Sequence, residues 1–392
     1  MKHILYGDGI HDDAPAIQEL LNTTGNVALP MPEKHYLLRS TLILHDNCSL
    51  SLPRFAHIRL DDGANCPMVA NAMTPDPDES RTPQAHTPLC RHLWSFVRDY
   101  SPTAICRNIA LSGGVWDCNN RGQLPNPEQS GVYEPHGYTG DGMLFYGVEN
   151  LTLSGLTLQD PVHYGVTLDR VSYFTVENIT FDYRTCNPIF LNMDGIHCNG
   201  NCHFGHIRNL QGACYDDLVA LNAHEGSKGS ITNISIDGIY AKDCHSAARL
   251  LTVSDEIKNI HISNVYGTYY CYCLGLTKYY PGETTGFFDG ISFDHIYAAK
   301  SKGTAYTPDR AKEPFIFIQS DTHTKNLYIR DLVRDEYELP VPTISIGADA
   351  LVENMVLSHI AAENHVSGKM PVLQNAGQVQ HLTMENISEK QP

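Results

Sequence analysis

Three aspartates in the middle of the chain, Asp194, Asp216 and Asp217, lie at the start of short segments in which apolar residues alternate. Arg249 lies at the start of the next such segment. If these segments are strands of successive stacked coils, the charged residues form an outward row with a step of about 5 Å. Like charges at that range raise the pKa of at least one carboxyl group. Such a row can keep one acid protonated beside ionised bases, so it predicts acid–base chemistry.

A pair of adjacent aspartates also has a purely structural interpretation. Asp12-Asp13 and Asp61-Asp62 are expected to cap turns, because Asp side chains readily bond to nearby backbone amides. Asp216-Asp217 differs from these pairs in lying between a third aspartate and an arginine. This setting favours the functional interpretation.

The elements that would position these residues come from a repeated phrase, in which a turn-like residue is followed by apolar residues at alternate positions. The phrase occurs ten times, and successive copies begin 23 to 42 residues apart. A drifting period is typical of stacked coils with loops of different length between them. The copies begin at Asn108, Asn150, Tyr173, Phe204, Asn233, Asn259, Gly290, Asn326, Asn354 and His381.

The alternation within each phrase predicts a β-strand with one buried face. A helical repeat would need apolar residues at spacings of three and four, which the phrases lack. We therefore predict an all-β, single-domain, right-handed parallel β-helix over residues 1–392. Its regular coils are expected over 100–392 and an N-terminal cap over 1–30.

The open end of such a stack must be covered, and the N-terminal region offers a short amphipathic helix over 12–22. Pro15 falls in its first turn, where a missing amide costs nothing. Ile17, Leu20 and Leu21 are predicted to form its buried face. We expect this helix to be a cap without chemistry.

Several motifs resemble the polygalacturonase family, family 28 of the glycoside hydrolases. They are Gly7-Asp8-Gly9, Ser112-Gly113-Gly114-Val115-Trp116-Asp117, Asn192-Met193-Asp194-Gly195-Ile196 and Asp216-Asp217 in the next coil. The resemblance covers residues 7 to about 280, and its most specific element is the Asp194 strand one coil before the aspartate pair. It implies hydrolysis of an α-galacturonosidic bond by direct attack of water, with inversion.

The resemblance also implies a role for each aspartate. Asp216 resembles the general acid that protonates the leaving oxygen, and Asp194 and Asp217 resemble the pair that holds and deprotonates the water. Inverting sites place their carboxyl groups about 6.5–9.5 Å apart, a gap that side chains of adjacent coils can span. This reaction needs no cofactor, and none is expected.

The chain departs from the family pattern around the aspartate pair. Tyr215 replaces the expected glycine, and the family's Gly-His-Gly is not found. His245 lies near that place and is the candidate supporting residue. Arg249 and Lys278 are the candidates for binding a substrate carboxylate, although their spacing is not that of the family.

Aromatic residues and a histidine flank the carboxylates in neighbouring coils. His163 and Tyr164 align one coil before Asp194 and are candidates for extending the sugar-binding subsite. Tyr272 lies in the coil after Arg249, where its ring suits sugar stacking. Packing at the edge of the coil is an equally good interpretation of these aromatic side chains.

A metal site is not expected. His197-Cys198 and Cys202-His203 could form a cluster, but strand alternation turns His197 and Cys198 to opposite faces. The sequence therefore predicts neither zinc nor another bound metal.

Composition limits the remaining function classes. The 392 residues carry a net charge of −17, which repels nucleic acid and anionic membranes. The twelve cysteines contain no CxxC pair, and reduced thiols are expected. The start of the chain has no apolar leader and no stretch is long enough to span a membrane, so a cytoplasmic location is expected. The expected partner is then a short galacturonate-containing oligosaccharide cleaved from one end; no feature predicts the oligomeric state.

Two alternatives remain open at this stage. A uronate lyase or epimerase would use the carboxylates to hold calcium, with Arg249 or Lys278 as the base. A carbohydrate-binding or tailspike-like β-helix would bind saccharide without turnover. Calcium dependence, an unsaturated product or binding without new reducing ends would distinguish them.

Overall fold

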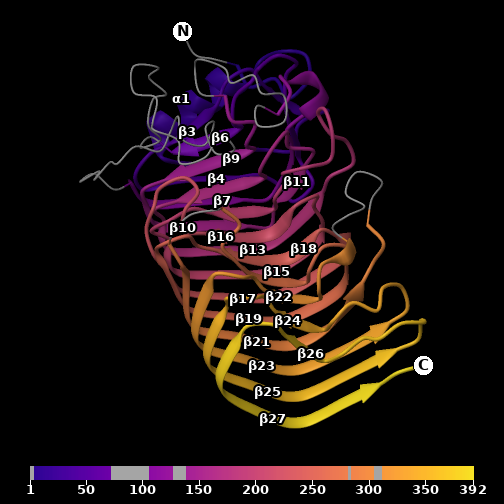
Figure 1. Cartoon of the computed structure of the whole chain (residues 1–392). Helices are drawn as coiled ribbons and strands as arrows, with labels where there is room; N and C mark the ends of the chain where they lie inside the picture. Colours follow the sequence, from indigo (N-terminus) through magenta and orange to yellow (C-terminus); the bar gives the residue numbers. More distant parts are fainter. Residues whose placement is uncertain (1–3, 72–105, 127–137, 281–283, 304–310) are drawn as a thin grey trace. The chain divides into compact units, whose positions relative to one another are not determined.

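The computed structural model describes the chain except residues 1–3, 72–105, 127–137, 281–283 and 304–310. The first residues of the expected cap therefore lie outside the described residues, as do positions 100–105, 127–137, 281–283 and 304–310 of the expected coils. Two compact units are present, and each is a stack of parallel β-coils (Figure 1). This confirms the predicted parallel β-helix fold. The N-terminal unit comprises 1–205 with 225–227, and the C-terminal unit comprises 206–224 with 228–392.

In the N-terminal unit, one sheet has the order β1-β4-β7-β10-β13 and a second has the order β3-β6-β9-β12-β14. Short strands β2, β5, β8 and β11 form a further ladder. Ile109, Leu151 and Phe174 pair in register and are buried, so they stack as one apolar ladder. The strands are β1 Asn26–Ala28, β2 Tyr36–Leu38, β3 Leu42–Leu44, β4 Cys48–Ser51, β5 His57–Leu60, β6 Val69–Asn71, β7 Cys106–Ser112, β8 Val115–Asp117, β9 Met143–Tyr146, β10 Val148–Ser154, β11 Thr157–Gln159, β12 Val166–Asp169, β13 Ser172–Asp182 and β14 Ile196–Cys198.

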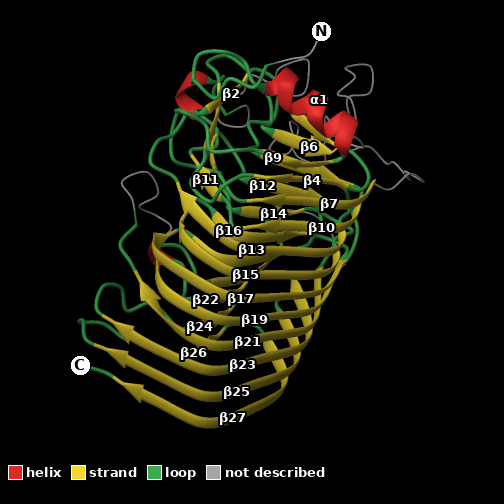
Figure 2. Cartoon of the chain, turned by 180° about the vertical axis from the view of Figure 1, so that it is seen from behind, coloured by secondary structure: helices red, strands yellow, loops and turns green. Residues whose placement is uncertain are grey.

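In the C-terminal unit, β15-β17-β19-β21-β23-β25-β27 form one sheet and β16-β18-β20-β22-β24-β26 the other. Figure 2 shows the long strands of the first sheet bending as they stack. Ile260, Ile291 and Leu327 pair in register and are buried. The strands are β15 His203–Ala213, β16 Asp217–Asn222, β17 Ile231–Cys244, β18 Ser246–Leu251, β19 Glu256–Tyr269, β20 Leu274–Thr277, β21 Gly286–Lys300, β22 Ile316–Ile318, β23 Thr322–Glu336, β24 Ile344–Ile346, β25 Leu351–Asn364, β26 Leu373–Asn375 and β27 Gln378–Lys390.

The repeated phrases occupy the long sheet of each unit, and the first residues of seven of the ten are in the left-handed conformation. Asn150 and Asn233 have φ of 66° and 60°, a left-handed conformation that asparagine tolerates better than most residues. The side-chain amides at this position also bond along the stack, as from Asn150 to Asn108 at 2.8 Å and from Asn259 to Asn233 at 3.1 Å. Asparagine therefore both permits the bend and links successive coils.

The predicted helix is present as α1, Ala14–Thr24, and ends at Gly25 in a left-handed conformation. Ile17 and Leu21 are buried as predicted. Leu20 is 37% exposed, so the prediction that it belongs to the buried face was wrong. The buried face runs instead through Ala14, Ile17 and Leu21, at helical spacings of three and four.

The coils begin well before residue 100, where the sequence placed the first regular ones. β1 pairs with β4, and β4 pairs with β7, so the long sheet of the N-terminal unit already contains residues 26–28. These first strands have only three or four residues. Segments that short cannot display the alternation by which the later coils were recognised.

Among the described residues, no helix is long and apolar enough to cross a membrane. The cysteines that the structure describes are free, and most of them are buried.

Candidate active site

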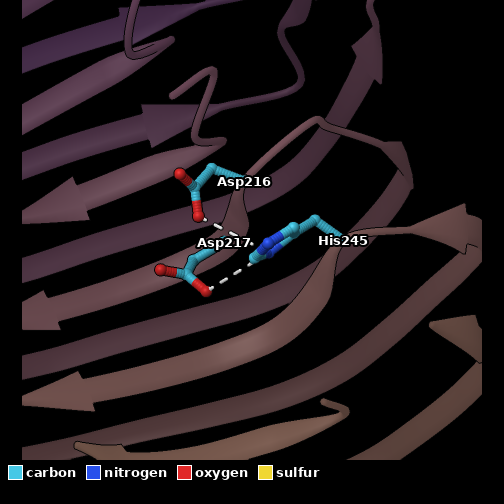
Figure 3. Close-up of side chains that lie close together, drawn as sticks. All are labelled: Asp216, Asp217 and His245. Atoms are coloured by element: carbon cyan, nitrogen blue, oxygen red, sulfur yellow. Dashed lines mark ion pairs between the residues drawn. The ribbon is translucent and has the colours of Figure 1, made fainter. Parts of the chain in front are cut away.

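Asp216 and Asp217 lie where the chain enters β16, and His245 immediately precedes β18, the neighbouring strand in the same sheet (Figure 3). Asp217 pairs with Ser246, whereas Arg249 pairs with Ala220. The predicted register, with Arg249 directly beside Asp217, was therefore wrong by three residues. β18 starts earlier than expected because Ala247 and Ala248 are buried strand residues that the alternation of larger apolar side chains did not reveal.

The Asp217 side chain is fully buried between two partners. Ser246 donates its hydroxyl to Oδ1, and Nε of Arg249 lies 2.6 Å from Oδ2. Burial raises the pKa of the Asp217 carboxyl, the Arg249 guanidinium opposes the shift, and nearby Asp216 adds to it. Asp217 is thus a fixed carboxyl group whose charge depends on its arginine.

Asp216 is more accessible, with 14% of its side chain exposed. Nδ1 of His245 lies 3.5 Å from Oδ1 of Asp216 and 3.9 Å from Oδ1 of Asp217. Figure 3 shows the imidazole ring directed at both carboxyl groups. The structure therefore brings the predicted supporting histidine to the aspartate pair, and the accessible Asp216 is the carboxyl better placed to meet a ligand.

Aromatic rings surround the histidine and the arginine. The ring of His245 makes edge-to-face contacts with Tyr270 and Tyr272, at centroid distances of 5.2 and 6.3 Å. Burial raises the pKa of Tyr272 well above its ordinary value, so this phenol stays protonated. The Arg249 guanidinium lies 6.0 Å from the centroid of the Tyr279 ring. These contacts hold His245 and Arg249 in place.

Lys278, the second predicted anion-binding residue, is 4% exposed. Its Nζ lies 3.9 Å from Oδ2 of Asp321, and its backbone amide donates to the side chain of Gln319. A role for Lys278 in binding substrate stays a prediction, as does a sugar contact of the buried Tyr272.

The spacing of Asp216, Asp217 and His245 also suits a metal ion, because one ligand atom from each lies within 4.8 Å of the others. Among the described residues, Asp335, Glu363 and His365 form a second group with this spacing, and it is exposed. In the first group both oxygens of Asp217 already face Ser246 and Arg249. A metal ion would have to compete with those partners.

Asp194 belongs to the N-terminal unit, where it is 1% exposed. Its Oδ2 lies 2.6 Å from Nδ1 of His197, and Nε2 of His197 lies 3.2 Å from Oε2 of Glu225. Asp216 and Asp217 belong to the C-terminal unit, so the meeting of all three aspartates in one groove stays a prediction. The sequence analysis missed the roles of His197 and Glu225. Neither contact had a usable signal, because residues three apart in an extended strand point to opposite faces and Glu225 lies in a loop with no recognisable pattern.

His163 and Tyr164 lie one coil before Asp194, as predicted, because Val166 pairs with Ile196. Both are buried; the Tyr164 ring stacks on His197 at a centroid distance of 3.8 Å and lies tilted against His163 at 3.6 Å. Their expected contact with sugar stays a prediction.

Comparison with known proteins gives structural likenesses only. No family model and no curated protein sequence matches the chain. It resembles the Streptococcus pneumoniae surface protein and adhesin PfbA (TM-score 0.60, 14% identity, 99% of this chain and 97% of that one). It also resembles the Azotobacter vinelandii mannuronan C-5 epimerase AlgE6 A-module (0.55, 12%, 99% and 98%). A Yersinia enterocolitica family 28 exopolygalacturonase is similar as well (0.53, 13%, 99% and 79%).

At these identities the likenesses show the fold alone. The chain is a parallel β-helix protein, and its described residues include a buried cluster of two aspartates, a histidine and an arginine.

Proposed function

We propose that this chain is a glycoside hydrolase that cleaves galacturonate-containing oligosaccharides with inversion. The observation that carries the proposal is the gathering of Asp216, Asp217 and His245, with Arg249 bound to Asp217. Two adjacent carboxyl groups with different partners and different exposure can hold different charges, which acid–base hydrolysis requires. The resemblance of the Asp194 strand and the aspartate pair to family 28 enzymes supports the same class.

In this proposal Asp216 is the general acid. It is the accessible carboxyl, and it gives its proton to the leaving oxygen as the glycosidic bond breaks. His245 orients Asp216. Asp217 is held by Ser246 and Arg249. Together with Asp194 it forms the pair of carboxylates that holds the attacking water and takes its proton. The water oxygen forms the new bond at the anomeric carbon, on the face opposite the leaving group.

Arg249 and Lys278 are proposed to bind the carboxylate of the sugar. Nε of Arg249 lies 2.6 Å from Oδ2 of Asp217, and a guanidinium carries five N–H donors in a geometry that suits carboxylates. The net charge of −17 opposes binding of a long polyanion. We therefore propose that the enzyme trims short oligosaccharides from one end.

The test is incubation with galacturonate di- to hexasaccharides in the presence of EDTA, with products followed by mass spectrometry. Proton NMR of the first product assigns its anomer, which should be inverted. Successive release of one sugar would support trimming from the end. A retained anomer, or no cleavage of any oligosaccharide in the series, would refute the proposal. Saccharide binding without products, equal in the wild type and in Asp216→Asn, would indicate a non-catalytic binding protein.

A second candidate is a uronate lyase or epimerase that uses a metal ion. The favouring observation is the spacing of Asp216, Asp217 and His245, whose ligand atoms can reach one ion. Absorbance of an unsaturated product, or inversion at C5 without chain cleavage, would appear only with added calcium. Activity that survives EDTA would exclude this candidate.

A further inference from the structure

The N-terminal unit contains a histidine with a carboxylate at each ring nitrogen. Nδ1 of His197 lies 2.6 Å from Oδ2 of Asp194, and Nε2 lies 3.2 Å from Oε2 of Glu225. All three side chains are almost fully excluded from solvent. Water therefore contributes little to the charge balance of this cluster.

The charge of the His197 ring sets how many N–H donors it offers. A neutral imidazole has one N–H donor and can satisfy only one of the two carboxylates, whereas an imidazolium has two. Burial disfavours the charged ring, but the hydrogen bonds to Asp194 and Glu225 outweigh it and raise the pKa of His197 to about 10. A charged ring supplies one N–H donor to each of the two carboxyl groups.

Neighbouring groups hold His197 and Asp194 in position. The Tyr164 ring lies parallel to His197, with an interplanar angle of 8°. The hydroxyl of Tyr183 donates to the backbone carbonyl of Asp194 at 3.0 Å. Beyond Tyr164, Nδ1 of His163 lies 2.9 Å from Oδ1 of Asp141, so these two titratable groups are paired with each other.

We propose that His197 is a positioning residue: its doubly protonated ring bridges Asp194 and Glu225 and keeps the Asp194 carboxylate ionised and fixed in orientation. This inference rests on the proposed function, in which Asp194 is one of the two carboxylates that hold and deprotonate the attacking water. A buried carboxyl without a cation would hold its own proton and could not act as a base. Glu225 is the second carboxylate of the bridge, and its charge favours the second proton on the His197 ring.

The first test does not depend on activity. In the full chain labelled with ¹⁵N-histidine, NMR should show His197 protonated on both nitrogens at pH 8, and His197→Asn identifies the signal. Glu225→Gln should lower the pH at which that signal changes by at least one unit. A singly protonated ring at pH 8 would overturn the proposal.

The second test separates charge from hydrogen bonding. His197→Asn keeps an amide donor near the Nδ1 position but carries no charge. The acidic limb of its kcat/KM profile should move to higher pH by at least one unit, about a tenfold loss of rate at pH 5, with a smaller change in KM. Glu225→Gln, which preserves shape, should move the limb in the same direction and serves if His197→Asn fails to fold.

The matched control is His365→Asn, because His365 also lies between two carboxylates, Asp335 and Glu363, but is partly exposed. It should leave the profile unchanged. An acidic limb that stays in place in both His197→Asn and Glu225→Gln would overturn the positioning role. If no oligosaccharide is cleaved by the wild type, the proposed function fails, and the NMR result alone then decides for or against the charged bridge.

Discussion

Two clusters of the C-terminal unit contain the same kinds of side chain and differ in burial. In one, Asp216, Asp217 and His245 have at most 14% of each side chain exposed. In the other, Asp335 is 62% exposed, and Glu363 and His365 are 41% and 31% exposed. Solvent and salt screen the charges of an exposed cluster, whereas burial makes each charge depend on its neighbours.

The cations of the two clusters show the same contrast. Arg249 is 13% exposed where it meets the fully buried Asp217, and Lys390 is 66% exposed where it meets Glu363. A buried ion pair is costly to break, because the remaining charge is left without a partner or solvent. An exposed pair contributes little. Burial, rather than residue type, therefore makes the first cluster a candidate for chemistry.

The largest effect is expected from Arg249→Met. At pH 8 the buried Asp217 carboxylate would lose its cation, and the free energy of unfolding should fall by about 3–5 kcal/mol. The loss should be smaller at pH 5, because a proton can then neutralise Asp217. Urea unfolding at both pH values measures the difference; equal losses would show that Asp217 does not titrate in this range.

Asp216→Asn should lower kcat on a galacturonate oligosaccharide by at least about 100-fold, the scale of acid–base catalysis. Its amide has no proton to give to the leaving oxygen, while its shape is preserved. Asp335→Asn is the matched control and should retain the wild-type rate. Equal rates for the two variants would remove Asp216 from the mechanism.

The buried His197 and the partly exposed His365 should also differ in how they make the stability of the fold depend on pH. The pKa of His197 is raised to about 10 in the folded chain and is about 6.5 when unfolded. Its stabilising contribution is therefore fully present below about pH 6.5 and is lost as the pH rises through about 10. Burial lowers the pKa of Lys300 to about 8. The contribution of Lys300 to stability therefore increases as the pH rises above about 8, opposite to that of His197.

The measurement is consequently a difference between Tm curves from pH 6 to 10. The curve of His197→Asn should approach that of the wild type as the pH rises, whereas His365→Asn should remain parallel to the wild type. A constant offset for His197→Asn would contradict the raised pKa.

The smallest effect is expected from Lys390→Met. Removing this exposed cation should change the free energy of unfolding by less than about 1 kcal/mol, and less at high salt. A loss comparable to that of Arg249→Met would show that burial is not what separates the two clusters. Urea unfolding at low and high salt measures it.

The repeated phrase alone was enough to predict the strands of the long sheets from β7 onward. Alternation of apolar residues is a local property, and the bends at Asn150 and Asn233 follow from a conformational preference of asparagine itself. The same holds for α1, where the spacing of Ile17 and Leu21 indicated the buried face. The proximity of Asp216 to Asp217, and the nearness of His245 in the next coil, also followed from sequence.

Only the tertiary structure decided which residues meet across coils. The pairing of Asp217 with Ser246 depends on where β18 begins, and β18 begins at Ser246 because β17 ends at Cys244 and the chain turns at His245. Glu225, a loop residue, contacts His197, a strand residue 28 positions earlier, and no local sequence pattern predicts this contact. Periodicity determines which face of a strand is buried, but the register between strands depends on distant parts of the chain.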